Sequence, residues 1–153
     1  MKKLLIYVDA SVVGGCEDAE FAADSQALWR AFFDGVHTLV LSEHTLRELK
    51  VAPEVVRGKL DEVPKDNQIL LTDSAEASQL ADEYLRRGIV GPGSRSDATH
   101  VAMATVGRVD VLASWNFRHM VNLRRIRAFN AVNIELGYGI IEIRTPKEVM
   151  EYE

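Results

Sequence analysis

The chain has 153 residues, of which 47% are hydrophobic and 27% charged, so it can bury the core of one globular domain without disulfides. We therefore expect a single domain over residues 1–153. The net charge of −5 argues against a protein that coats nucleic acid with its whole surface. The charge is uneven, because residues 86–127 carry eight arginines and two aspartates, which is +6, and the rest carries −11. These arginines either line solvated helix faces or form a surface that faces phosphate beside an acidic pocket.

The single cysteine and the short apolar run near the N-terminus indicate in which cellular compartment the protein is expected. Cys16 has no second cysteine to pair with, which favours a reducing compartment, and the cytoplasm is the simplest one. After Met1-Lys2-Lys3, the apolar run Leu4–Val8 meets Asp9 after five residues. That run is too short for the core of a signal peptide or for a membrane span, so we expect no contact with a membrane.

Short apolar runs alternate with segments of helical period along the whole chain. In chain order we predict strand Leu4–Val8, helix Asp18–Phe33, strand Thr38–Leu41, a helix capped by Ser42 that carries Leu46 and Leu49, a helix from Pro53 to near Val63-Pro64, strand Gln68–Leu71, a helix capped by Asp73 or Ser74 that ends at Arg87, a loop over Gly88–Arg95, a helix from Ser96-Asp97 to Val106, strand Val109–Ala113, helix Phe117–Phe129, strand Gly139–Ile143 and a short helix from Pro146. This alternation predicts a three-layer α/β/α fold with a mainly parallel central sheet. In such sheets ligands bind beyond the carboxyl ends of the strands, so site residues are sought there.

Asp9 stands at the carboxyl end of the first predicted strand, which is apolar on both faces and therefore central. An ionised carboxylate without a partner at such a place is costly or has a shifted pKa. One interpretation is structural, with Asp9 as a helix N-cap or in a turn with Ala10-Ser11. The other is a metal ligand, which the acidic residues of later segments favour.

Glu48 lies about two turns into the helix after the second strand, where a solvated glutamate is the plain alternative. Glu43 competes with it, although the helix dipole favours an acid in the first turn for structural reasons alone. His44 and Glu48 are four residues apart on one helix face, which suits a pair of zinc ligands. No third ligand stands at a recognisable spacing from them, so a zinc site is not predicted.

Asp97 opens the helix after the Gly-Pro-Gly loop, a position that also favours an acid electrostatically, and His100 follows one turn later. Ser114-Trp115-Asn116 follows the fourth strand, where Asn116 offers a neutral oxygen ligand or a hydrogen bond that orients a water. Asp110 lies at the opposite end of that strand and is expected to be a cap or turn residue.

Three carboxylates and one amide, each at a strand end or on an adjoining helix, make a set of oxygen donors. Such donors suit hard cations that keep several waters, namely Mg²⁺ or Mn²⁺. The single cysteine and the lack of a recognisable histidine set argue against zinc. The expected ligands are Asp9, Glu48, Asp97 and Asn116.

Four segments together resemble a PIN domain, and specifically the VapC-like ribonuclease toxins of prokaryotic type II toxin–antitoxin systems. The resemblance covers nearly the whole chain and rests on the order and spacing of the segments, because each one alone is short or degenerate. They are YVDASV at Tyr7–Val12, SEHTLREL from Ser42, SDATHVA at Ser96–Ala102 and VDVLASWNFRHMVN at Val109–Asn122.

The resemblance implies a metal-dependent endoribonuclease that hydrolyses RNA phosphodiester bonds. The acids that match Asp9, Glu48 and Asp97 bind Mg²⁺ or Mn²⁺ in that family, and a hydroxyl residue that matches Ser114 lines the same pocket. Asn116 stands where the family has a fourth acid, which lowers the formal charge of the site by one and weakens a second metal position. The alternative is therefore a catalytically weakened PIN-like module that binds protein or RNA.

The resemblance also implies partners, namely an RNA substrate, a cognate antitoxin protein and a second copy of the chain in a homodimer. Ser11, Arg95 and Arg118 are candidates for contact with the RNA substrate because of their positions beside the predicted site. Other α/β enzymes fit less well, since an Asp-x-Asp phosphatase needs an acid where Ala10-Ser11 stands and a receiver domain needs an acidic pair near the first strand. No Gly-x-Gly-x-x-Gly or P-loop pattern is present in the sequence.

Overall fold

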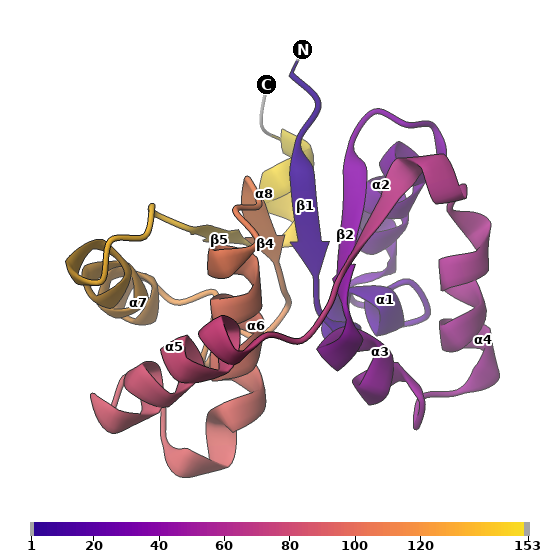
Figure 1. The fold of residues 1–153 in the computed structure, drawn as a ribbon. Helices are drawn as coiled ribbons and strands as arrows, with labels where there is room; N and C mark the ends of the chain where they lie inside the picture. The colour runs from indigo at the N-terminus through magenta and orange to yellow at the C-terminus, as the bar shows by residue number, and fades with distance from the viewer. Residues whose placement is uncertain (1, 152–153) are drawn as a thin grey trace.

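The centre of the computed structural model, which describes residues 2–151, is a sheet of five strands with helices on both faces (Figure 1). The strands lie in the order β3-β2-β1-β4-β5, and all four neighbouring pairs are parallel. They are β1 (Leu5–Val8), β2 (Thr38–Ser42), β3 (Gln68–Leu71), β4 (Val111–Ala113) and β5 (Glu142–Arg144). The predicted three-layer fold with a parallel sheet is thus confirmed.

Strand β1 is central because it pairs with β2 on one side and with β4 on the other. Ile6, Tyr7 and Val8 are all fully buried, as a strand that is apolar on both faces predicts. Val8 stands opposite Ala113 of β4, so the residues that follow these two strands emerge at the same edge of the sheet. Figure 1 shows this edge below the sheet, next to α1 and α3.

Two apolar cores hold the three layers together. Alternate side chains of β1 point to opposite faces, so Tyr7 belongs to one core while Ile6 and Val8 belong to the other. The core on the Tyr7 face is covered by α5, α6 and α7, and the other by α1, α2, α3, α4 and α8. The helices are α1 (Ala10–Gly15), α2 (Ala22–Phe33), α3 (Glu43–Leu49), α4 (Glu54–Arg57), α5 (Ala75–Arg86), α6 (Arg95–Val106), α7 (Leu123–Glu135) and α8 (Pro146–Glu151), with 3₁₀ turns at Gly58–Glu62, Lys65–Asn67 and Pro92–Ser94.

The first helix, α1, was not predicted. Its six residues contain two glycines, which have poor helix propensity, and so give no helical pattern. The helix is held instead by its N-cap, where the Asp9 side chain accepts a hydrogen bond from the backbone N–H of Val12, and by burial of Val12 and Val13. The second helix, α2, begins at Ala22 rather than at Asp18.

Two other predicted boundaries are wrong for identifiable reasons. The helix placed at Phe117–Phe129 is α7, which begins only at Leu123 because Asn122 caps it, while the preceding residues form turns. The predicted helix from Pro53 is α4, which passes into a 3₁₀ turn at Gly58. The remaining boundaries shift less: α6 starts at Arg95, β4 at Val111, and β5 covers Glu142–Arg144 instead of Gly139–Ile143.

No helix within residues 2–151 is both long enough and apolar enough to cross a bilayer.

Gly15 of α1 marks a close approach between α1 and the segment after β4. A Cβ at Gly15 would lie 2.5 Å from Ser25 Oγ and 2.9 Å from Trp115 Nε1, whereas a Cβ at Gly14 would meet no atom within 4 Å. We predict that Gly15→Ala lowers the free energy of unfolding by about 1–3 kcal/mol, because these two side chains must move apart. Gly14→Ala is the matched control and should be neutral or stabilising by up to about 1 kcal/mol. Urea denaturation of both variants checks this, and equal effects would contradict it.

Candidate functional site

Asp9 leaves β1 at the carboxyl edge of the sheet and caps α1, so the N-cap interpretation from the sequence is confirmed. Both carboxylate oxygens also accept hydroxyl hydrogen bonds, from Ser11 Oγ to Oδ1 at 2.5 Å and from Ser114 Oγ to Oδ2 at 2.6 Å. The residue is only 5% exposed, and it forms no ion pair with any residue in the range 2–151. A buried carboxylate that receives only neutral donors is a suitable place for a cation.

Hydrogen bonds through Ser114 and Asn116 connect Asp9 to Asp97. The backbone N–H of Asn116 donates to Ser114 Oγ at 3.0 Å, and Asn116 Nδ2 donates to Asp97 Oδ1 at 3.1 Å. The structure therefore brings together four of the predicted site residues from the ends of β1 and β4 and the start of α6. We call Asp9, Asp97, Ser114 and Asn116 the acidic site.

Asn116 presents its amide nitrogen, and not its oxygen, to the acidic site. Its Oδ1 accepts a hydrogen bond from the backbone N–H of His119 at 3.0 Å, which fixes the orientation of the amide. This differs from the oxygen ligand expected from the sequence, because the turn after β4 occupies that oxygen. Asn116 here holds the Asp97 carboxylate in place.

The pKa of Asp97 shows that the acidic residues are electrostatically coupled. Burial raises this pKa, and the charge of Asp9 raises it further. His119 opposes the shift through its Nδ1, which lies 3.1 Å from Asp97 Oδ2, and His100 opposes it through its charge, but the net direction is upward. A cation bound between Asp9 and Asp97 would remove this repulsion.

Glu48 is bound in a different way, because two histidines and a serine surround it. Its Oε1 lies 2.7 Å from His100 Nε2, and its Oε2 accepts from Ser96 Oγ at 2.7 Å and lies 3.9 Å from His44 Nε2. Burial favours protonated Glu48, but the hydrogen bond and charge of His100, with the help of Ser96 and His44, outweigh burial and lower the pKa to about 2. Glu48 is therefore ionised at neutral pH.

His44, Glu48 and His100 form what we call the histidine–glutamate cluster. One ligand atom from each lies within 4.8 Å of the other two. Within residues 2–151, this is the group of three or more Asp, Glu, His or Cys side chains whose ligand atoms lie this close together. Asp9, Glu48 and Asp97 do not approach one another as closely. The third partner that the sequence did not reveal for His44 and Glu48 is His100, from α6.

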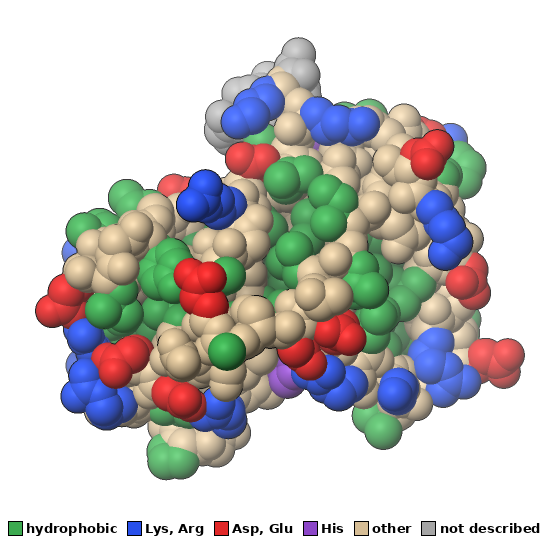
Figure 2. Space-filling model, in the orientation of Figure 1, with side chains coloured by type: hydrophobic (Ala, Val, Ile, Leu, Met, Phe, Trp, Pro, Cys, Tyr) green, Lys and Arg blue, Asp and Glu red, His purple; other side chains and the backbone are tan. Residues whose placement is uncertain are grey.

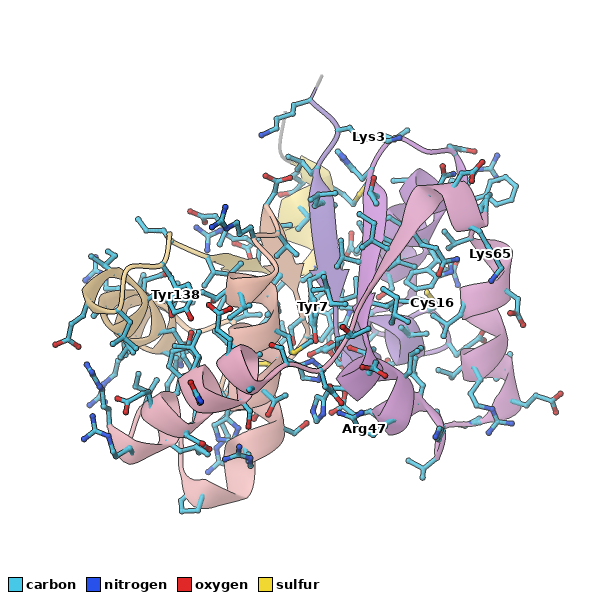
Figure 3. The ribbon with its side chains drawn as sticks, viewed as in Figure 1. Lys3, Tyr7, Cys16, Arg47, Lys65 and Tyr138 are labelled. Carbon is cyan, nitrogen blue, oxygen red and sulfur yellow. The ribbon has the colours of Figure 1, made fainter. Side chains whose placement is uncertain are left out.

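A chain of buried hydrogen bonds orients His100. Tyr7 OH lies 2.7 Å from His100 Nδ1 and 2.7 Å from Ser42 Oγ. His100 donates through Nε2 to ionised Glu48, and Tyr7 OH bridges His100 Nδ1 and Ser42 Oγ. Burial raises the pKa of Tyr7, which keeps the phenol protonated for this role. Figure 3 shows Tyr7 near the carboxyl end of β1.

The sequence analysis assigned no role in the site to three residues, namely Tyr7, His100 and His119. A tyrosine inside an apolar buried strand gives a usable signal, because its hydroxyl needs a partner when it is buried. His119 carries no comparable signal, since its contact with Asp97 depends on the turn that follows Asn116.

The residues predicted to contact substrate have different surroundings. Ser11 Oγ donates to Asp9 and accepts from the backbone N–H of Trp115 at 3.0 Å, so it ties α1 to the segment after β4. Arg95 pairs with Asp82 of α5 at 2.7 Å, while Arg118 is exposed and has no ion-pair partner in residues 2–151. Glu43 accepts a hydrogen bond from the backbone N–H of Asp73 and thus faces the start of α5.

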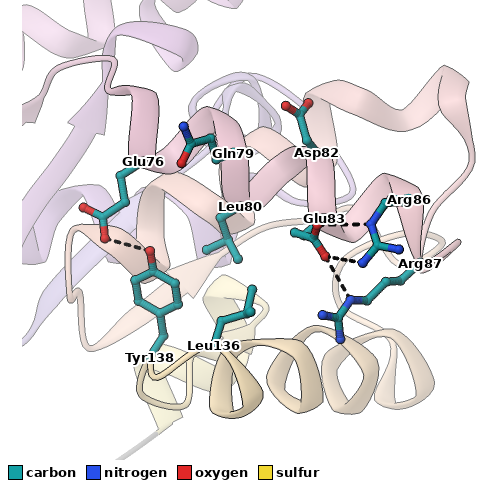
Figure 4. Close-up of a pocket in the computed structure, with 9 residues that line it drawn as sticks. All are labelled: Glu76, Gln79, Leu80, Asp82, Glu83, Arg86, Arg87, Leu136 and Tyr138. Carbon is teal, nitrogen blue, oxygen red and sulfur yellow. Dashed lines mark hydrogen bonds and ion pairs between the residues drawn. The ribbon is translucent and has the colours of Figure 1, made fainter.

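At the end of α5, acidic side chains neutralise the first two arginines of the arginine-rich segment, Arg86 and Arg87. Glu83 binds both Arg86 and Arg87 (Figure 4), and Arg87 also pairs with Glu135. Glu83, Arg86 and Arg87 line a cavity of about 650 Å³ that also reaches Leu136 and Tyr138 and contains no residue of the acidic site. Acidic and basic side chains are interspersed on the face shown in Figure 2. For Arg86 and Arg87, the interpretation as a solvated helix face is therefore confirmed.

Two solved structures share the fold of this chain. VapC20 of Mycobacterium tuberculosis, a toxin that cleaves the sarcin-ricin loop, matches with a TM-score of 0.56 and 18% identity over 74% of this chain and 92% of its own. VapBC2 of Rickettsia felis, bound to a DNA fragment from its promoter, matches with a TM-score of 0.55 and 14% identity over 92% of this chain and 98% of its own. No family model and no curated protein sequence matches the chain significantly. The chain thus has the PIN-like fold of the VapC toxins.

Because the pKa of Glu48 is low in the folded protein, the free energy of unfolding should fall as the solution becomes acidic. Because this pKa is about 2 in the folded protein and 4.5 ordinarily, the contribution of Glu48 is complete above about pH 4.5 and is lost as the pH falls through about 2. We predict that Glu48→Gln removes about 2–3 kcal/mol at neutral pH and flattens the acid limb of the stability curve. Chemical denaturation between pH 2 and 7 measures this. Glu43→Gln on the same helix is the control, and an unchanged slope in the Glu48 variant would contradict the assignment.

Proposed function

We propose that this protein is a Mg²⁺- or Mn²⁺-dependent endoribonuclease that cleaves RNA phosphodiester bonds as the toxin of a toxin–antitoxin pair. The observation that carries the proposal is the acidic site, where Asp9 and Asp97 come from distant segments and are joined by Ser114 and Asn116. The shared fold with VapC toxins, one of which cleaves the sarcin-ricin loop, supports the RNA substrate.

The donors of the acidic site fit a hard divalent cation. Asp9 and Asp97 would hold the ion, and Glu48 would complete its shell or orient a water, since its ionised carboxylate lies at the same edge of the sheet. When bound, the cation supplies Lewis-acid activation of the phosphate and of a water. Ser114 and Ser11 fix the Asp9 carboxylate for this task.

RNA contacts would come from side chains around this edge. Arg118 follows Asn116 closely in the chain and is exposed, so its charge is available to a phosphate. Arg95 would have to exchange Asp82 for phosphate before it could take part. These assignments make Arg118 the stronger candidate of the two.

Asp9→Asn tests the function directly. The substitution removes a ligand charge and keeps the volume, and the amide oxygen can still accept from Ser11 and Val12, while the amide nitrogen would have to donate to Ser114 Oγ, so the fold should remain. We expect Mn²⁺-dependent cleavage of single-stranded RNA to fall by at least about 100-fold, and the wild-type activity to disappear with a chelator.

Asp110→Asn is the matched control, since Asp110 lies at the opposite end of the sheet and accepts from the backbone N–H of Leu5. It should retain cleavage. Full activity of the Asp9 variant, with circular dichroism unchanged, would refute the metal assignment.

The second candidate function is a module that binds protein or RNA without cutting it, and Asn116 favours it because it replaces an acid with an N–H donor. Asn116→Asp separates the two functions. We predict that the new carboxylate, facing Asp97, tightens Mn²⁺ binding roughly 5- to 10-fold and increases cleavage. Calorimetry and an RNA cleavage assay measure both. Cation binding without cleavage in either protein would favour the binding module.

We also infer an antitoxin partner and a homodimer. VapBC2 is a toxin–antitoxin complex of the same fold, which supports the antitoxin. Beside the acidic site, Phe117 and Leu123 are 52% and 67% exposed and line a cavity of about 450 Å³, where an apolar helix of a partner would fit.

Expression of the chain in cells tests the toxin role. If the expressed chain is not toxic and no small protein copurifies with it, this result would argue against that role. Light scattering of the pure chain gives its oligomeric state.

A further inference from the structure

We propose that the histidine–glutamate cluster is a second metal site, beside the acidic site, that binds a transition-metal ion of the Zn²⁺ type through His44, Glu48 and His100. His44 and Glu48 lie one turn apart on α3, and His100 reaches them from α6. Their ligand atoms already lie within 4.8 Å of one another, so small side-chain movements would bring all three to one ion.

Zinc binding requires ring nitrogens without a proton. His100 Nε2 donates to Glu48, and His44 Nε2 donates to Ser96 Oγ at 2.8 Å, because the Ser96 hydroxyl itself donates to Glu48. An ion would therefore displace these protons, to the second ring nitrogen or to solvent. An ion on these ligands would replace the contacts that Glu48 makes with His100 at 2.7 Å and with His44 at 3.9 Å.

The surroundings of the cluster resemble the outer shell of a metal site. Metal-bound histidines hold their second ring nitrogen in a hydrogen bond, and His100 has this arrangement through Tyr7 OH, which in turn contacts Ser42. Ser96 holds the second oxygen of Glu48. The rings of His44 and His100 meet edge to face, with centroids 4.6 Å apart.

The donor chemistry separates this cluster from the acidic site. Two imidazole nitrogens with one carboxylate suit Zn²⁺ and its neighbours, whereas the oxygen donors of Asp9 and Asp97 suit Mg²⁺ or Mn²⁺. The cluster is also accessible, because the side chains of His44 and Glu48 are 18% and 31% exposed. A cavity of about 430 Å³ reaches His44 and Ser96, which leaves room beside His44 for a water as the fourth ligand.

The inference does not rest on the nuclease function, because it uses only the three ligands and their contacts. Both sites share the carboxylate of Glu48, so a variant of Asp9 distinguishes them. Asp9→Asn should weaken Mn²⁺ binding at the acidic site and leave Zn²⁺ binding at the cluster unchanged.

The experiment is calorimetric titration of the metal-free full chain with Zn²⁺, for the wild type and for the variants His44→Gln, His100→Gln and Asp9→Asn. We expect one Zn²⁺ per chain, and an affinity at least about 100-fold weaker in each histidine variant, since even the loss of an outer-shell partner costs 10- to 100-fold. His37→Gln and His119→Gln are matched controls that remove a histidine elsewhere and should bind Zn²⁺ like the wild type.

His100 is buried, so His100→Gln could unfold the chain, and circular dichroism checks this. His44 is partly exposed, so His44→Gln should fold, and this variant tests the proposal even if His100→Gln unfolds. X-ray absorption of the zinc complex should show two imidazole nitrogens at about 2.0–2.1 Å. No zinc uptake, unchanged affinity in His44→Gln, or loss of zinc in Asp9→Asn would overturn the proposal.

Discussion

The parallel pairing of β1 with β2 and β4 is the constraint on which the rest of the molecule depends. Because the three strands run in the same direction and Val8 stands opposite Ala113, the residues after each strand emerge at one edge. Asp9 and Ser114 meet there and are joined by a hydrogen bond of 2.6 Å, although 105 positions separate them. A change of register by one residue would turn one of them to the opposite face of the sheet.

Burying charge at this edge requires compensation, and the chain provides it differently for each acid. Asp9 receives two hydroxyls and the N–H of α1, which are neutral. Glu48 receives His100 and Ser96, and its pKa falls to about 2. Asp97 receives His119 and Asn116, but burial outweighs them and its pKa rises. The neighbouring pair Asp9 and Asp97 is therefore where a cation would contribute most.

Two donor sets follow from this difference. Oxygen ligands remain around Asp9 and Asp97, while nitrogen ligands gather around Glu48. Asn116 strengthens the separation, because its amide N–H holds Asp97 and adds no negative charge. A neutral amide in the acidic site and two histidines beside Glu48 thus both shift the metal preference of this edge away from hard cations.

The amino-acid sequence by itself determined the fold class and the positions of the acids. Apolar runs such as Leu4–Val8 are short and bounded by polar residues, which predicts buried parallel strands, and a carboxylate at the end of such a run predicts a site. Less regular elements were missed, since the two glycines of α1 carry no helical pattern and Asn122, rather than Phe117, begins the next long helix.

Only the tertiary structure decided what each acid touches. Glu48 and His100 are 52 positions apart and meet because α3 and α6 lie together beyond the sheet. The orientation of the Asn116 amide likewise depends on the turn around His119, and Arg95 turns to Asp82 because α5 passes beside it. Sequence spacing reports neighbours only within a strand or a helical turn, whereas these contacts arise from how separate elements pack.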